Sequence, residues 1–105
     1  MLLIINSLLF EKVLEKVKKI INLPIEDDKI RKFITVCDEI YTKEYLGIDD
    51  YGKDVDYEME LTTIAAAYEI SIFYNYQRSA EMRTKLVEKM KEKSPTHPSQ
   101  LFCFE

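Results

Sequence analysis

The amino-acid sequence predicts an all-α fold: a bundle of three to four helices with a long central third helix and extended termini. Only two Gly and three Pro occur in 105 residues, fewer than is usual in a β-sandwich or a loop-rich scaffold. Good helix formers, chiefly Glu, Lys, Leu, Ile and Ala, dominate the composition. The segment 54–78 contains neither Gly nor Pro and repeats apolar residues at helical spacing. A chain of this length forms one domain.

The first two helices follow from two separate amphipathic patterns. The first is expected over residues 8–21 and ends before residues 22–24, because Pro24 cannot continue a helix interior. The second begins near residues 26–28, where three acids suit the positive end of the helix dipole, and ends before Gly47. Its apolar stripe is predicted to consist of Ile30, Phe33, Ile34, Cys37, Ile40, Tyr41 and Tyr45.

The third helix, expected over residues 54–77, is apolar on two separate faces. A surface helix has one apolar stripe, whereas a helix that is apolar on most sides is enclosed. Tyr is frequent in this segment, and amphipathic Tyr is enriched at interfaces. We expect one face to meet a neighbouring subunit, although its rings could instead border the chain's own core. The residues assigned to this oligomer interface are Tyr57, Leu61, Ile64, Tyr68, Ile72 and Tyr76.

A fourth helix is expected over residues 80–92, after a junction at Arg78-Ser79 where Ser79 can act as the N-cap. The alternative is that the third helix continues through Ser79. Residues 94–105 contain two Pro residues and are expected to form an extended C-terminal tail. The predicted organisation is therefore a single helical domain over residues 1–93 followed by that tail.

The sequence contains no residue set typical of catalysis, cofactor binding or metal binding. Its one histidine, His97, lies in the predicted tail, and Cys37 and Cys103 are too far apart for a zinc motif. The loop 49–54 is acidic like a calcium loop, but Lys53 occupies a ligand position. We predict a protein that is not an enzyme and that needs no cofactor and no metal. No apolar stretch approaches the roughly 18 residues of a membrane span, so we expect a soluble intracellular protein with no membrane partner.

Two parts of the chain resemble the small helical head–tail connector (adaptor) proteins of tailed bacteriophages. The opening helix FEKVLEKVKKIINL precedes IEDDKIRKFITVCDEIYTKEYLGI, which is similar to the acidic start and amphipathic helix of those connectors. The later segment ELTTIAAAYEISIFYNYQRS looks like their apolar third helix. The resemblance covers residues 10–79, about two thirds of the chain.

The resemblance implies a ring-forming structural protein of the virion neck, made in the host cytoplasm. Its partners would be other copies of itself, the portal, and tail or stopper proteins. DNA would pass through the ring without being recognised. We hypothesise that an acidic surface lines this channel and repels the phosphates. The residues assigned to it are Asp49, Asp50, Asp54 and Asp56.

The charge distribution leaves two other classes of protein open. Residues 26–77 carry a net charge of −8, although the whole chain carries only −4. An acidic inhibitor or DNA mimic that binds a nucleic-acid enzyme would have such a surface. A small helical regulator, such as a toxin–antitoxin partner, would dimerise through the third helix and bind DNA in a salt-dependent way.

Overall fold

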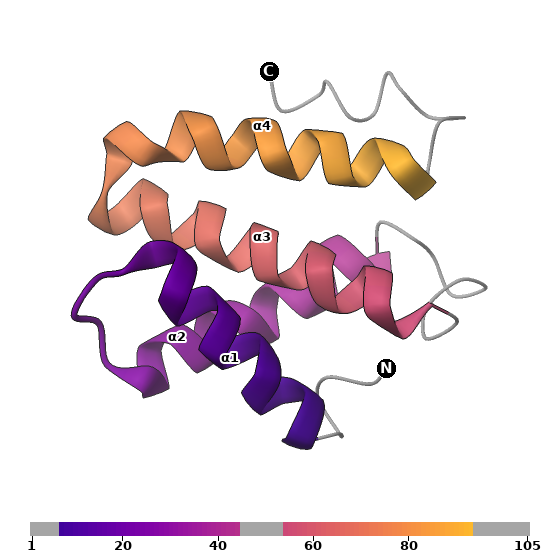
Figure 1. Ribbon diagram of the computed structural model, residues 1–105, viewed down its shortest axis with the longest axis horizontal. Coiled ribbons are helices and arrows are strands. Elements are labelled where there is room, and N and C mark those ends of the chain that lie inside the picture. Colours follow the sequence, from indigo (N-terminus) through magenta and orange to yellow (C-terminus); the bar gives the residue numbers. More distant parts are fainter. Residues whose placement is uncertain (1–6, 45–53, 94–105) are drawn as a thin grey trace.

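The computed structural model describes residues 7–44 and 54–93, and all of its elements are helical. Within these ranges there are four α-helices, a π-helix and no strand, which confirms the predicted all-α bundle. The helix α3 lies between the antiparallel helix α4 on one side and the pair α1 and α2 on the other (Figure 1). The elements are α1 (Ser7–Ile21), α2 (Asp27–Cys37), the π-helix η1 (Asp38–Glu44), α3 (Val55–Tyr74) and α4 (Tyr76–Lys93).

The helix α1 buries one apolar stripe and ends where the sequence predicted. Its buried side chains are Val13, Leu14, Val17 and Ile21, which recur at helical spacing. The residue after the helix, Asn22, has a φ of 48°, the left-handed conformation that commonly ends helices. Its amide donates a hydrogen bond of 3.0 Å to the Lys18 carbonyl, which caps the last turn.

The second predicted helix changes type after Cys37. The sequence pattern indicated one continuous α-helix, but the chain forms the π-helix η1 from Asp38 onward. In a π-helix, residues five positions apart lie on the same side of the helix, because the backbone hydrogen bonds join residues i and i+5. Cys37 and Thr42 are five positions apart, and both are buried in the core. Asp38 is buried as well, and its Oδ1 accepts a 2.9 Å hydrogen bond from the Thr42 hydroxyl. Thr62 of α3 lies 3.5 Å from the same oxygen.

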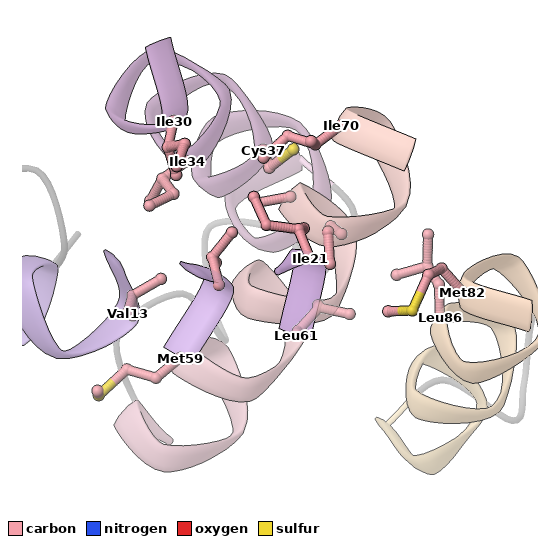
Figure 2. Close-up of a cluster of buried hydrophobic side chains, with 14 of the residues drawn as sticks. Val13, Ile21, Ile30, Ile34, Cys37, Met59, Leu61, Ile70, Met82 and Leu86 are labelled. Carbon is pink, nitrogen blue, oxygen red and sulfur yellow. The ribbon is translucent and has the colours of Figure 1, made fainter. Parts of the chain in front are cut away.

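The helix α3 is enclosed by the rest of its own chain. Asp54 is its N-cap and accepts a 3.1 Å hydrogen bond from the Tyr57 amide. The three consecutive residues Ala65, Ala66 and Ala67 are all fully buried, although they point in different directions around the helix. Figure 2 shows how α1, α2 and α3 contribute to the core, while Met82 and Leu86 approach α3 from α4. Both apolar faces therefore have partners within the chain.

A single residue separates α3 from α4. The sequence placed the junction at Arg78-Ser79, but the break is at Asn75, and Ser79 lies inside α4. The Asn75 amide donates to the Ser71 carbonyl at 2.8 Å, and the Asn75 carbonyl accepts from the Arg78 amide at 3.0 Å. This short turn makes α3 and α4 an antiparallel hairpin (Figure 1). The Arg78 guanidinium donates to the carbonyl of Ile20, which ties the hairpin to the end of α1.

The sequence predicted that no segment of the chain spans a membrane, and the described helices can be compared with that expectation. Within residues 7–44 and 54–93, no helix combines the length and the apolar character that crossing a bilayer requires.

Candidate interaction surface

The structure divides the six residues assigned to an oligomer interface into two groups. Tyr57 and Leu61 are 5% and 0% exposed, because α4 covers this end of α3. The Tyr57 hydroxyl donates a 2.7 Å hydrogen bond to the Lys89 carbonyl of α4. The assignment of these two residues to an interface between subunits is therefore corrected: they belong to the core of one chain. Ile64, Tyr68 and Ile72 are half-buried and Tyr76 is 75% exposed, so these four stay candidates.

The four residues assigned to an acidic channel surface also separate. Asp49 and Asp50 lie outside the described residues. Asp54 is half-buried and uses its carboxylate to cap α3. Asp56 is exposed in the first turn of the same helix, where an acid suits the helix dipole. Of the two described residues, Asp56 is therefore the one exposed without a capping role.

An open apolar groove lies between α2, η1 and the C-terminal end of α3. We call it the α2–α3 groove, and its volume is about 350 Å³. Three of its apolar side chains are well exposed: Phe73 by 70%, Val36 by 54% and Ile40 by 47%. Side chains this apolar and this exposed, gathered in one hollow, are typical of a surface that another molecule covers. The groove is lined by Lys32, Phe33, Val36, Cys37, Ile40, Tyr41, Glu69 and Phe73.

The aromatic and polar side chains of the groove hold one another in place. The rings of Phe33 and Phe73 lie 5.9 Å apart between centroids at an interplanar angle of 53°, a tilted arrangement that aromatic pairs favour. The Tyr41 hydroxyl donates a 2.8 Å hydrogen bond to Oε2 of Glu69. Burial, together with this bond to a carboxylate, raises the pKa of Tyr41 far above its usual value. The phenol therefore stays protonated and remains a donor at neutral pH.

The groove continues into two further cavities over α3 and α4. Tyr41 and Glu69 also line a neighbouring cavity of about 210 Å³, whose other wall includes Arg83 and Val87 of α4. A third cavity, of about 590 Å³, is lined by Tyr68, Ile72 and Tyr76 among others. Tyr68 and Arg83 line both of these cavities. Three of the residues predicted for an interface thus border the same extended surface as the α2–α3 groove.

The sequence pattern missed the residues that make this groove. Phe33 and Ile40 were assigned to the buried stripe of the second helix, but Phe33 is half-buried and Ile40 is 47% exposed. For Ile40 the reason is the switch to π geometry at Asp38, which changes the direction of every side chain after it. Nothing in the spacing of the third helix indicated that its end at Phe73 is uncovered.

Cys37 lies under the groove and is almost completely buried. Burial raises the pKa of its thiol far above the usual value, and the nearby carboxylates of Glu69 and Asp38 add to the effect. The described residues include no group of three or more His, Cys, Asp or Glu side chains placed to hold a metal ion.

We expect the Cys37 thiol to be unreactive in the folded protein. In a Cys103→Ser variant, the reaction of the Cys37 thiol with a disulfide reagent at pH 8 should be about 100-fold slower than in urea, because the thiolate is both disfavoured and inaccessible.

The raised pKa of Cys37 also makes stability depend on pH. The unfolded thiol ionises near pH 8.5, whereas the folded thiol stays protonated, so the free energy of unfolding falls as the pH rises above about 8.5. The fall is at most about 1.4 kcal/mol per pH unit and should be absent in a Cys37→Ala variant below about pH 10, where an unfolded Tyr begins to ionise. Equal reaction rates with and without urea would contradict the prediction that the folded thiol is unreactive.

Comparison of the chain with models of protein families, with curated proteins and with solved structures found no match.

Proposed function

We propose that this chain is a non-enzymatic assembly protein that binds other protein subunits through the α2–α3 groove and the adjoining surface of α3 and α4. The observation that carries the proposal is the exposure of Val36, Ile40 and Phe73 in one hollow. The core does not need these side chains, because α3 already has partners on both sides. Surfaces of this kind are typical of protein–protein contacts.

The specific role we propose is that of a head–tail connector in a phage neck. The resemblance of residues 10–79 to those connectors supports this role. In this role the groove would contact either a neighbouring copy in a ring or the portal, and DNA would pass through the ring. The proposal keeps Ile64, Tyr68, Ile72 and Tyr76 as interface residues and no longer includes Tyr57 and Leu61.

The assembly proposal is tested by Phe73→Ser, which removes the most exposed aromatic side chain of the groove. We expect this variant to fold normally but to lose binding to portal and tail proteins. Sedimentation of the mixtures and electron microscopy of the resulting rings would measure the loss. Leu8→Ser is the matched control, because Leu8 is 66% exposed on α1 and does not line the groove.

Three outcomes would contradict this proposal, the first by excluding the groove and the other two by excluding the connector role. The Phe73→Ser and wild-type proteins could assemble equally well, which would remove the groove from the interface. The wild-type protein could stay apart from itself and from every portal and tail protein. It could also form a tight complex with a basic nucleic-acid enzyme as a monomer, which would favour the inhibitor or DNA mimic instead.

The acidic channel surface remains a proposal and can be tested at Asp56. Charge reversal by Asp56→Lys should slow DNA ejection from assembled particles, because a cation in the channel attracts the phosphates. Asp54 is less suitable, since its substitution would also remove the N-cap of α3. Glu88→Lys is the matched control, because Glu88 is exposed on α4. An ejection rate that is the same for both variants and the wild type would refute the channel assignment.

A further inference from the structure

The carboxylate of Glu69 is the unusual feature of the α2–α3 groove. Apolar and aromatic side chains, including Phe33, Val36 and Phe73, make up most of the groove, yet Glu69 is half-buried among them. Its one hydrogen bond within the described part of the chain comes from the neutral Tyr41 hydroxyl at 2.8 Å. Lys32 also lines the groove, but neither it nor any other cation of residues 7–44 and 54–93 forms an ion pair with Glu69.

This arrangement restricts what can cover the groove. A partner that excludes water would remove the hydration of the Glu69 carboxylate and leave it with a single neutral donor. Because Glu69 is only half-buried, leaving it without a counter-charge offsets part of what the apolar contacts return. A purely apolar partner therefore fits the walls of the groove but not Glu69. The partner that fits the whole groove brings a cation to Glu69 together with apolar groups for Val36, Ile40 and Phe73.

Lys and Arg side chains meet both requirements. Their methylene stems pack on apolar surface while the charged end reaches a carboxylate. The neighbouring rings of Phe33 and Phe73 also favour a cation, through the negative potential of aromatic faces.

The shape of the surface indicates a segment of protein rather than a small molecule. Tyr41 and Glu69 border both the α2–α3 groove and the cavity toward α4, so Glu69 lies at the junction of two hollows. Tyr68 and Arg83 extend the second hollow into a third cavity. The side chains along one face of a partner helix can occupy successive cavities, as those of amphipathic helices do in apolar grooves.

We infer that the α2–α3 groove binds an amphipathic segment of a partner protein that places a Lys or Arg against Glu69 and apolar side chains against Val36, Ile40 and Phe73. The inference rests on the proposed function and specifies the chemistry of the partner.

The test uses the full chain and three synthetic peptides of about four helical turns, ~14 residues each. All three carry the same row of Leu residues and differ at one flanking position, which is Lys, Gln or Glu. Binding is measured by isothermal titration calorimetry and by ¹⁵N chemical-shift changes at Glu69 and Phe73. We expect the Lys peptide to bind about threefold more tightly than the Gln peptide, as for a partly exposed ion pair, and the Glu peptide to bind most weakly.

Two matched pairs of variants separate the specific contact from general attraction to an acidic protein. Glu69→Gln keeps an acceptor for Tyr41 and removes the charge, so the Lys and Gln peptides should then bind equally. Asp56→Asn removes the same charge from an exposed position in the first turn of α3 and should preserve the threefold preference. Phe73→Ala should weaken all three peptides alike, whereas Leu8→Ala should weaken none.

Each contrary result has a distinct meaning. Equal binding of the Lys and Gln peptides to the wild type, or an equal effect of Glu69→Gln and Asp56→Asn, would overturn the cation assignment. Tightest binding of the Glu peptide would overturn it in favour of an acidic partner held by Lys32. If Phe73→Ala nevertheless weakens the binding, the groove remains an interaction surface and the proposed function stands. If Phe73→Ala has no effect on any peptide, the groove itself is not the binding surface and both proposals fail.

Discussion

Replacing Leu61 with Ala is expected to lower the free energy of unfolding by about 2–5 kcal/mol. Leu61 is completely buried in α3 and belongs to the same core as Met82 and Leu86 of α4. Truncation removes buried methyl groups and leaves a cavity that the surrounding helices can fill only in part. The loss should be measured by urea unfolding followed by circular dichroism, at several protein concentrations.

The concentration dependence makes this a test of the corrected assignment. If Leu61 belongs to the core of one chain, the loss of stability is the same at every protein concentration. If Leu61 instead lay between subunits, the midpoint of unfolding of the wild type would rise with concentration, and the Ala variant would lose that rise. Leu8→Ala is the control, because Leu8 is 66% exposed on α1 and its truncation should change stability by less than about 0.5 kcal/mol.

Replacing Asp38 with Ala is expected to lower the free energy of unfolding by about 2–3 kcal/mol. Asp38 is 1% exposed, and its Oδ1 accepts hydrogen bonds from Thr42 at 2.9 Å and from Thr62 at 3.5 Å. Without the carboxylate, the buried Thr62 hydroxyl loses this acceptor and the Thr42 hydroxyl keeps the Asp38 backbone carbonyl, while both stay shielded from water. We also expect faster amide hydrogen exchange across η1, because the contact between η1 and α3 would be weaker.

Two further variants show whether the hydrogen bonds cause the effect. Asp38→Asn keeps one side-chain oxygen as an acceptor and should recover part of the lost stability. Glu39→Ala changes the next residue of η1, which is exposed, and should be nearly neutral. A loss below about 0.5 kcal/mol for Asp38→Ala would mean that the buried cluster does not hold η1 against α3.

The helices themselves could be predicted from the sequence with good accuracy. Apolar spacing located α1 and the start of α2 to within a residue or two, because a helical period is a local property of the chain. Asn22 and Pro24 marked the end of α1 for the same reason: each restricts its own backbone or that of its neighbours. The two apolar faces of α3 correctly indicated that the helix is enclosed, although one face was expected to meet a neighbouring subunit and instead packs against α4 of the same chain.

The position of the second break could not be predicted in this way. Ser79 is a good N-cap in isolation, but the chain turns at Asn75 instead. Turning there allows Met82, Leu86 and Met90 of α4 to pack in the core with α3. It also brings Arg78 to the Ile20 carbonyl at the end of α1. These contacts join residues far apart in the sequence, so no local rule of capping includes them.

The same limit applies to the π-helix and to the candidate site. Asp38 and Thr42 look like polar residues on the edge of an amphipathic helix until Thr62 approaches from α3. The groove exists because η1 turns Ile40 outward and because α4 leaves the end of α3 at Phe73 uncovered.

The sequence by itself determined that this protein is helical, where most of its helices begin, and that its third helix avoids water on nearly every side. Only the tertiary structure decided that α1, α2 and α4 of the same chain cover that helix, and that Phe73, Val36 and Ile40 are left exposed. The physical reason is that the periodicity of a sequence shows which side chains are stabilised by burial. Which surface buries them depends on how helices that are distant in the sequence pack against one another.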